Sequence, residues 1–116
     1  MHKAKSLLNL GVYNAIADDY TKALGYYAKA LSIYEEQNNL KGIASTNNNM
    51  GIAYAEKSDF VKALEHYLKA LDIMVELGNK RGMGIAYNSI GNIYVDLSDY
   101  PQAIEFHPCL QVPLLF

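Results

Sequence analysis

The chain has 116 residues, of which 51% are hydrophobic and 19% charged, and its 10 basic and 12 acidic side chains leave a net charge of −2. This length suits a single domain, and the composition is that of a folded protein and not of a disordered one. The charges are spread along the chain without a basic patch. We therefore expect neither nucleic acid nor an anionic membrane as a partner.

Cysteine usage and the apolar segments bear on where the protein resides. The single cysteine, Cys109, cannot form an internal disulfide, which suits a reducing compartment. Residues 1–20 lack the continuous apolar stretch of a signal peptide. No apolar run approaches the ~18 residues that a membrane span needs. The sequence thus predicts a cytoplasmic module.

Three segments resemble one another at a constant spacing, beginning at Gly11, Gly51 and Gly91. The identities between 11–37 and 51–77 are 12 of 27, whereas those between 91–107 and 51–67 are 6 of 17. An aspartate and an alanine recur in all three segments, as Asp19, Asp59 and Asp99 and as Ala23, Ala63 and Ala103. The repeat is therefore the unit of the fold, with units at about 4–40, 41–80 and 81–107.

Each unit is predicted to form two helices. In the second unit, residues 60–77 place apolar side chains such as Leu64 and Tyr67 three and four residues apart, which is typical of one helical face. Residues 42–57 carry a narrower stripe of this kind, which includes Asn47. A pair of helices cannot bury its apolar face alone, so the units should stack into an all-α solenoid of antiparallel helix hairpins.

Short polar pairs mark the helix ends. Ser58-Asp59 interrupts the apolar pattern, and either side chain is placed to cap the helix that follows. Asn38-Asn39 and Gly78-Asn79 end the longer helices. In the third unit Pro101 falls inside the first turn of the second helix, where a missing N–H is tolerated. Small residues such as Gly51 should let the two helices of a hairpin approach closely.

Glycine and tyrosine recur in the first helices, and alanine and tyrosine in the second. The pairs are Gly51-x-x-Tyr54 and Gly91-x-x-Tyr94 in the first helices, and Ala23-x-x-x-Tyr27 and Ala63-x-x-x-Tyr67 in the second. This pattern resembles the tetratricopeptide repeat, from residue 4 to about residue 107. The resemblance implies a right-handed superhelical solenoid of about two and a half repeats, occupying residues 1–107. It also implies a non-catalytic scaffold that binds a protein or peptide.

The sequence departs from the family pattern in two ways. The usual repeat has about 34 residues and closes its second helix with a proline, but Glu35 and Val75 stand in that place here. Without the proline, the second helix should run on and lengthen the period. In addition, Asn14 replaces the aromatic residue expected in the first unit, which should weaken the packing of that hairpin.

In tetratricopeptide arrays the first helices line a concave groove, and a stripe opposite Met50 should face it. The resemblance thus predicts a peptide-binding site formed by Asn9, Asn48, Asn49, Ile52, Glu56, Asn88, Asn92 and Asp96. A primary amide can donate to a peptide carbonyl and accept from its N–H, so it can hold a backbone of any sequence. The alternative is that the asparagines form a merely solvated face.

The charge of this lining suggests a kind of peptide. Chaperone-binding relatives use lysines and arginines as a clamp for acidic C-terminal peptides, and these are missing at the corresponding positions. The stripe tends instead toward asparagine, Glu56 and Asp96. We therefore expect a basic or neutral peptide.

Other chemical features point to packing or to solvent. Five of the ten tyrosines fall at packing positions of the repeat, namely Tyr20, Tyr27, Tyr67, Tyr94 and Tyr100. Four lysines fall on the outer face of the second helices, namely Lys22, Lys29, Lys62 and Lys69. His66 has no carboxylate or second histidine at ligand spacing. The sequence also lacks a phosphate loop, a His-Glu-x-x-His pair and a nucleophile elbow. We expect no catalytic residue, no metal and no cofactor.

Two alternative roles remain open. Repeats of this long type resemble those fused to signalling domains, so the chain could be a fragment of the sensor or adaptor region of a larger histidine kinase, cyclase or transcription regulator. An array of two and a half repeats also exposes apolar faces at both ends, which could stack on another copy to form a homo-oligomer.

The last residues depart from the repeat. The register holds up to His107, but the stretch from Pro108 to the end shares 0 of 9 with the equivalent part of the second unit. Pro108 and Pro113 fall where a helix should continue, at a cost of ~3 kcal/mol or more each. We expect an irregular apolar tail over residues 108–116, produced by a frameshift, an altered splice or a vector, or else evolved as a cap. Cys109 then belongs to a junction and not to a chemical site.

Overall fold

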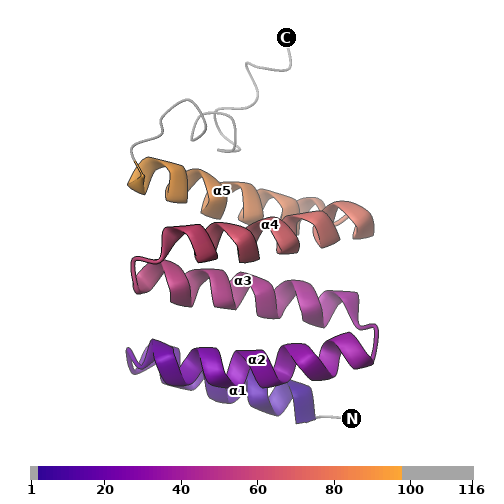
Figure 1. The fold of residues 1–116 in the computed structure, drawn as a ribbon. Helices are drawn as coiled ribbons and strands as arrows, with labels where there is room; N and C mark the ends of the chain where they lie inside the picture. Colours follow the sequence, from indigo (N-terminus) through magenta and orange to yellow (C-terminus); the bar gives the residue numbers. More distant parts are fainter. Residues whose placement is uncertain (1–2, 98–116) are drawn as a thin grey trace.

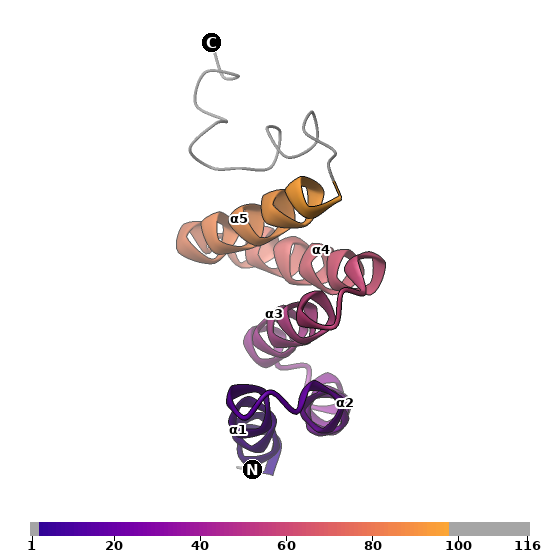
Figure 2. The same cartoon turned by 90° about the vertical axis from the view of Figure 1, so that its left-hand side faces the viewer.

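A computed structural model describes residues 3–97, which form five α-helices and no strand within that range. They are α1 (Lys3–Ile16), α2 (Tyr20–Glu36), α3 (Leu40–Glu56), α4 (Phe60–Leu77) and α5 (Lys80–Asp96). Consecutive helices run antiparallel and pack on one another, so that the helices are stacked in chain order (Figure 1). Seen along the helices, α1, α3 and α5 lie toward one side and α2 and α4 toward the other (Figure 2). The predicted all-α solenoid of helix hairpins is confirmed.

Two predictions fall beyond this part of the chain. The second helix of the third unit, which contains Tyr100 and Pro101, lies outside the described residues, as does the tail at 108–116. The boundary at residue 107 therefore stays a prediction.

The four linkers between the described helices share one conformation, a residue with positive φ followed by a helix-capping residue. The second-last linker residue has a positive φ, between 53° and 67°, at Asp18, Asn38, Ser58 and Gly78. The residue after it caps the next helix by accepting a hydrogen bond from the backbone N–H three residues on, at Asp19, Asn39, Asp59 and Asn79. Glycine, asparagine and aspartate tolerate the left-handed conformation best, and the short polar oxygen of asparagine or aspartate suits the cap. Of the two residues predicted to cap α4, Asp59 is the cap, and Ser58 is the linker residue with positive φ.

The second helices are long, as predicted. α2 has 17 residues and α4 has 18, and both continue past the places where the family pattern has proline, Glu35 and Val75. The first helices α3 and α5 have 17 residues each, so both helices of a unit contribute to the long period of the repeat.

Close contacts within each hairpin join a glycine on one helix to a tyrosine on the next. Tyr27 faces Gly11 and Tyr67 faces Gly51, and both tyrosines are buried. A Cβ atom at Gly51 would lie 2.6 Å from Cδ1 of Tyr67. Burial raises the pKa of Tyr67 to about 12, so its hydroxyl stays neutral at physiological pH. The tyrosines at these positions are packing residues, as predicted.

The other side chains assigned to packing or solvent behave as follows. Tyr20 and Tyr94 are half-buried, and Tyr100 lies outside the described residues. The four lysines predicted on the outer face, Lys22, Lys29, Lys62 and Lys69, are all exposed.

His66 is held by packing in the second hairpin. Its ring stacks on Tyr54 with the ring centroids 5.4 Å apart. Its Nδ1 lies 2.8 Å from Oδ1 of Asn47, whose amide nitrogen donates to the Ile43 carbonyl. Because Asn47 thus presents its oxygen, Nδ1 of His66 carries the proton and donates. Burial, and then the positive charge of Lys69, lower the pKa of His66, which keeps the ring neutral near pH 7.

The first unit has no such stack. Asn14, which takes the place of Tyr54, donates from Nδ2 to the Leu10 carbonyl of its own helix at 2.8 Å. The substitution thus replaces a contact between helices with one inside α1.

Candidate functional site

The exposed side of the odd-numbered helices is hollowed by three pockets. Two lie between α1 and α3, one toward each end of these helices, and the third lies between α3 and α5. All three take residues from two odd helices and have parts of α2 or α4 as their floor. We call the face lined by α1, α3 and α5 the groove. It consists of separate pockets that follow one another across consecutive repeats.

The first pocket, of about 430 Å³, lies where α3 begins. Lys5, Leu8 and Asn9 line it from α1, and Lys41 and Ser45 line it from α3. It combines two cationic side chains with an amide.

The second pocket, of about 250 Å³, lies where α3 ends. Asn49, Ile52 and Glu56 line it from α3, opposite Val12 and Ile16 of α1. Its walls are largely apolar, with one carboxylate at the rim.

Tyr20 of α2 closes that pocket from below. The hydroxyl of Tyr20 donates to Oδ1 of Asp18 at 3.3 Å. Partial burial of the ring, followed by the negative charge of Glu56, raises the pKa of Tyr20. The hydroxyl is therefore a neutral hydrogen-bonding group beside an anionic one.

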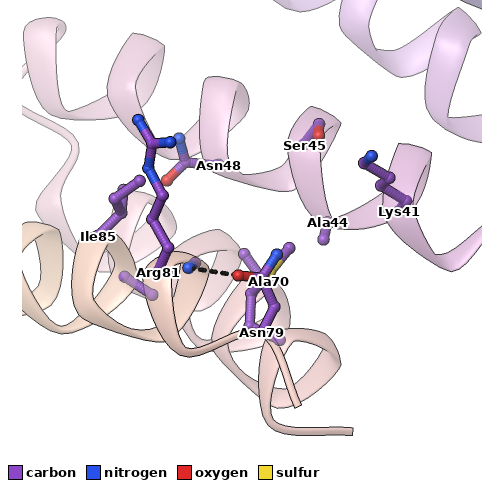
Figure 3. A pocket seen from close by; sticks show the side chains of 11 residues that line it. Lys41, Ala44, Ser45, Asn48, Ala70, Asn79, Arg81 and Ile85 are labelled. Carbon is purple, nitrogen blue, oxygen red and sulfur yellow. Dashed lines mark hydrogen bonds between the residues drawn. The ribbon is translucent and has the colours of Figure 1, made fainter. Parts of the chain in front are cut away.

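The third pocket, of about 210 Å³, lies between the starts of α3 and α5. Lys41, Ser45 and Asn48 line it from α3, and Arg81 and Ile85 from α5. Ala70 and Met74 of α4, together with Ala44, Asn79, Gly82 and Ala86, complete its lining. The Arg81 side chain extends across the pocket toward Asn48, as Figure 3 shows.

The run of three asparagines in α3 divides between core and groove. Asn47 is buried and bonded to His66, as its place in the inner stripe predicts. Asn48 and Asn49 are half-buried and line pockets on opposite sides of α3. Within residues 3–97 neither of their amides makes a hydrogen bond to another side chain or backbone group, so both can serve a ligand.

The predicted site residues do not all gather at the pockets. Asn9, Asn48, Asn49, Ile52 and Glu56 line one pocket each. Asn88, Asn92 and Asp96 are exposed on α5 and line none of the three.

Lys41, Arg81 and Met74 are among the pocket-lining residues that the predicted site does not include. Lys41 and Arg81 lie at the helix starts, outside the stripe opposite Met50, and Met74 belongs to a second helix. The signal for the two cations is that they are one repeat period apart, which places both at the second position of their helices.

The charges in the groove are ordered along the helices. Lys41 and Arg81 lie in the first turn of α3 and α5, whereas Glu56 and Asp96 are the last residues of the same helices. One end of the groove is therefore cationic and the other anionic.

The described residues form neither a metal-ligand cluster nor a membrane-spanning helix. Residues 3–97 contain no group of three or more histidine, cysteine, aspartate or glutamate side chains that could hold a metal ion. In the same range, no helix is both long enough and apolar enough to span a bilayer.

Stacked helix hairpins with a groove along the first helices define a helical-repeat protein. Two tetratricopeptide repeat models match the sequence, one over residues 42–107 and one over residues 4–36. The chain belongs to the tetratricopeptide repeat family, as its sequence pattern predicts. Repeats of this fold are generally protein–protein interaction modules and are typically non-catalytic. The first match ends at residue 107, where the register of the repeat is lost.

Solved structures share the fold at low sequence identity. The tetratricopeptide repeat domain of FLU from Arabidopsis is 18% identical with a TM-score of 0.88, and the match covers 98% of this chain and 96% of that one. BtubC (BKLC) from P. vanneervenii is 22% identical with a TM-score of 0.84, over 93% of this chain and 45% of that one. The N-terminal domain of stress-induced protein-1 (STI-1) from C. elegans is 22% identical with a TM-score of 0.75, over 89% and 77%. A search of curated protein sequences finds no significant match.

Proposed function

We propose that the protein is a scaffold whose groove holds a peptide segment of a partner protein. The observation that carries this proposal is the series of three pockets across α1, α3 and α5. Each pocket combines apolar walls with an amide that has no hydrogen-bond partner among the described residues, from Asn9, Asn48 or Asn49. Apolar pockets with a few polar groups suit the side chains and backbone of a peptide.

The amides of α3 have the best-defined role. Asn48 and Asn49 face different pockets, so together they can contact a segment that crosses α3. Each can donate to a carbonyl and accept from an N–H of the peptide. Asn88, Asn92 and Asp96 belong to the proposal as an extension of the same face along α5.

We expect the double replacement of Asn48 and Asn49 by alanine to weaken peptide binding by about thirtyfold, since each of the two lost hydrogen bonds costs ~1 kcal/mol. The probe is a peptide selected by the full chain from a random phage-displayed library, and binding is followed by fluorescence anisotropy. Asn14→Ala is the matched control, because its amide bonds within α1 on the side away from the groove.

The helicity of all variants should equal that of the wild type by circular dichroism. Equal affinities for wild type and the double variant would contradict the proposal for α3. Failure to select any peptide would count against a peptide-binding groove altogether.

A second candidate function, self-association, is favoured by the outer face of α1. Leu10 is 45% exposed and Tyr13 is 72% exposed. The equivalent residues of the second unit, Met50 and Ala53, are 6% and 1% exposed, because the helices of the preceding hairpin cover them. α1 thus exposes a stacking surface for a further helix, and we propose that a second copy of the chain supplies it.

Replacing Leu10 and Tyr13 by serine is expected to abolish this association. In light scattering across a concentration series, the mass of the wild type should rise with concentration and that of the variant should stay at 12.9 kDa, the mass of one chain. A constant monomer mass for the wild type would show that the surface does not pair copies.

A further inference from the structure

Two cationic side chains that have no acidic partner among the described residues line the α3–α5 pocket. Lys41 and Arg81 line it from neighbouring repeats, and within residues 3–97 neither makes an ion pair or a side-chain hydrogen bond. Both are exposed, so forming a contact with a ligand requires no structural change. Asn48 lies beside Arg81 (Figure 3) and adds two N–H donors. The three side chains together present donors and positive charge to one small volume.

These charges do not serve helix stability. The first turn of a helix carries a partial positive charge and favours acidic side chains, while the last turn favours basic ones, at about 0.3–1 kcal/mol per exposed group. In α3 and α5 the order is reversed, with Lys41 and Arg81 at the start and Glu56 and Asp96 at the end. None of the five helices has an acidic residue in its first turn. Interaction with the helix dipole therefore does not explain the positions of Lys41 and Arg81.

The shape of the pocket limits what the cations can hold. Its walls include Ala44, Ala70, Met74, Ile85 and Ala86, so only the rim is charged. An aspartate or glutamate of a docked peptide would place its carboxylate at such a rim, and the next residue of that peptide, if apolar, would cover Ile85. A planar carboxylate also matches the fork of the Arg81 guanidinium.

The opposite end of the groove restricts the position of this acidic residue. Glu56 lines the far α1–α3 pocket and Asp96 ends α5, so a carboxylate placed there would meet like charge. An acidic residue in the ligand is therefore favoured at one end of the groove and disfavoured at the other. The expectation of a basic or neutral peptide, which came from the sequence, rests on the anionic end of the groove alone.

We propose that the pocket between α3 and α5 takes an acidic side chain of the docked peptide, which Arg81 and Lys41 hold with Asn48, while an adjacent apolar residue packs on Ile85 and Met74. The ligand is then a protein segment that carries an acidic residue next to an apolar one. This inference rests on the groove being the peptide-binding surface.

The test uses the full chain and peptides that it selects from a random phage-displayed library. The selected peptides should be enriched in aspartate or glutamate beside an apolar residue. Changing that acid to its amide should weaken binding by about tenfold, as should Arg81→Gln, while Lys41→Gln should weaken it about threefold. Binding should also weaken as salt rises.

A matched control removes a cation elsewhere. Lys22→Gln deletes an exposed lysine of the outer face, and it should leave the affinity within a factor of about two. Arg81→Gln should also bind the amide version of the peptide as tightly as the wild type does, because no charge pair is left to lose. This double-mutant comparison separates a direct contact from a general effect of net charge.

The outcomes distinguish this inference from the proposed function. In one outcome, Asn48→Ala weakens binding of the selected peptides, but Arg81→Gln and Lys41→Gln bind them like the wild type. This outcome would support the groove as the binding surface and overturn the acidic specificity. A selected set without acidic enrichment would do the same. If no peptide were selected, or if no groove substitution changed the affinity of the selected peptides, both proposals would fail.

Discussion

Replacing Ile90 by alanine is expected to lower the free energy of unfolding by about 3 kcal/mol, since a buried isoleucine loses both its transfer energy and its packing. Ile90 is fully buried in α5, in the cluster that contains Tyr67, Leu71 and Ile93. This cluster joins α5 to α4, so the cavity left by the substitution would loosen the last described helix. Urea unfolding measures the change.

The same substitution at Ile85 is the control. Ile85 lies in the same helix but is 50% exposed, and it lines the α3–α5 pocket. Its loss should change the free energy of unfolding by ~0.5 kcal/mol or less. Equal effects at Ile85 and Ile90 would mean that the register of α5 against α4 is wrong.

Gly51→Ala is expected to destabilise the protein by about 1–3 kcal/mol, as overpacking of a tight core does. The added Cβ would lie 2.6 Å from the ring of Tyr67, which is buried and has little room to move. Thermal unfolding followed by circular dichroism measures the effect, and a loss of this size lowers the Tm by at least ~4 °C for a domain of this length.

Gly25→Ala supplies a control of opposite sign. Gly25 is exposed inside α2, and a Cβ atom there has no neighbour within 4 Å. Alanine should therefore raise the stability by about 0.5–1 kcal/mol, because it has the higher helix propensity. A stabilising effect at both glycines would contradict the close contact between α3 and α4.

The fold was predictable because one pattern occurs at a fixed spacing. The glycine–tyrosine and alanine–tyrosine pairs identify which helix faces meet, and their recurrence at a constant interval identifies the stacking. The pairs Asn38-Asn39 and Gly78-Asn79 locate helix ends, since the first residue must adopt a positive φ and the second must cap. Local preferences and long-range packing agree at these positions.

The site was predictable in part. The helical period correctly assigns Asn47 to the core and its two neighbours to the surface. It cannot tell which surface residues surround a pocket, because a pocket depends on the distance and twist between helices of different repeats. For this reason the sequence stripe includes Asn88 and Asn92, which line none of the three pockets, and omits Lys41 and Arg81, which do.

That omission matters for the charge of the ligand. A stripe drawn opposite Met50 includes the carboxylates at the ends of α3 and α5 and excludes the cations at their starts. The groove has both, so its net character cannot be taken from one helix face. Whether the chain belongs to a larger signalling protein stays a prediction.

The most direct test of the groove is to locate a bound peptide by NMR. The selected acidic peptide is titrated into the ¹⁵N-labelled chain of 116 residues, and the backbone amide shifts are followed. We predict that the largest changes fall on the pocket-lining residues of α3 and α5, such as Asn48, Ile52 and Ile85. Changes that concentrate on the outer face of α2 and α4, at Lys22 and Lys62, with the groove residues unaffected, would contradict the proposed function.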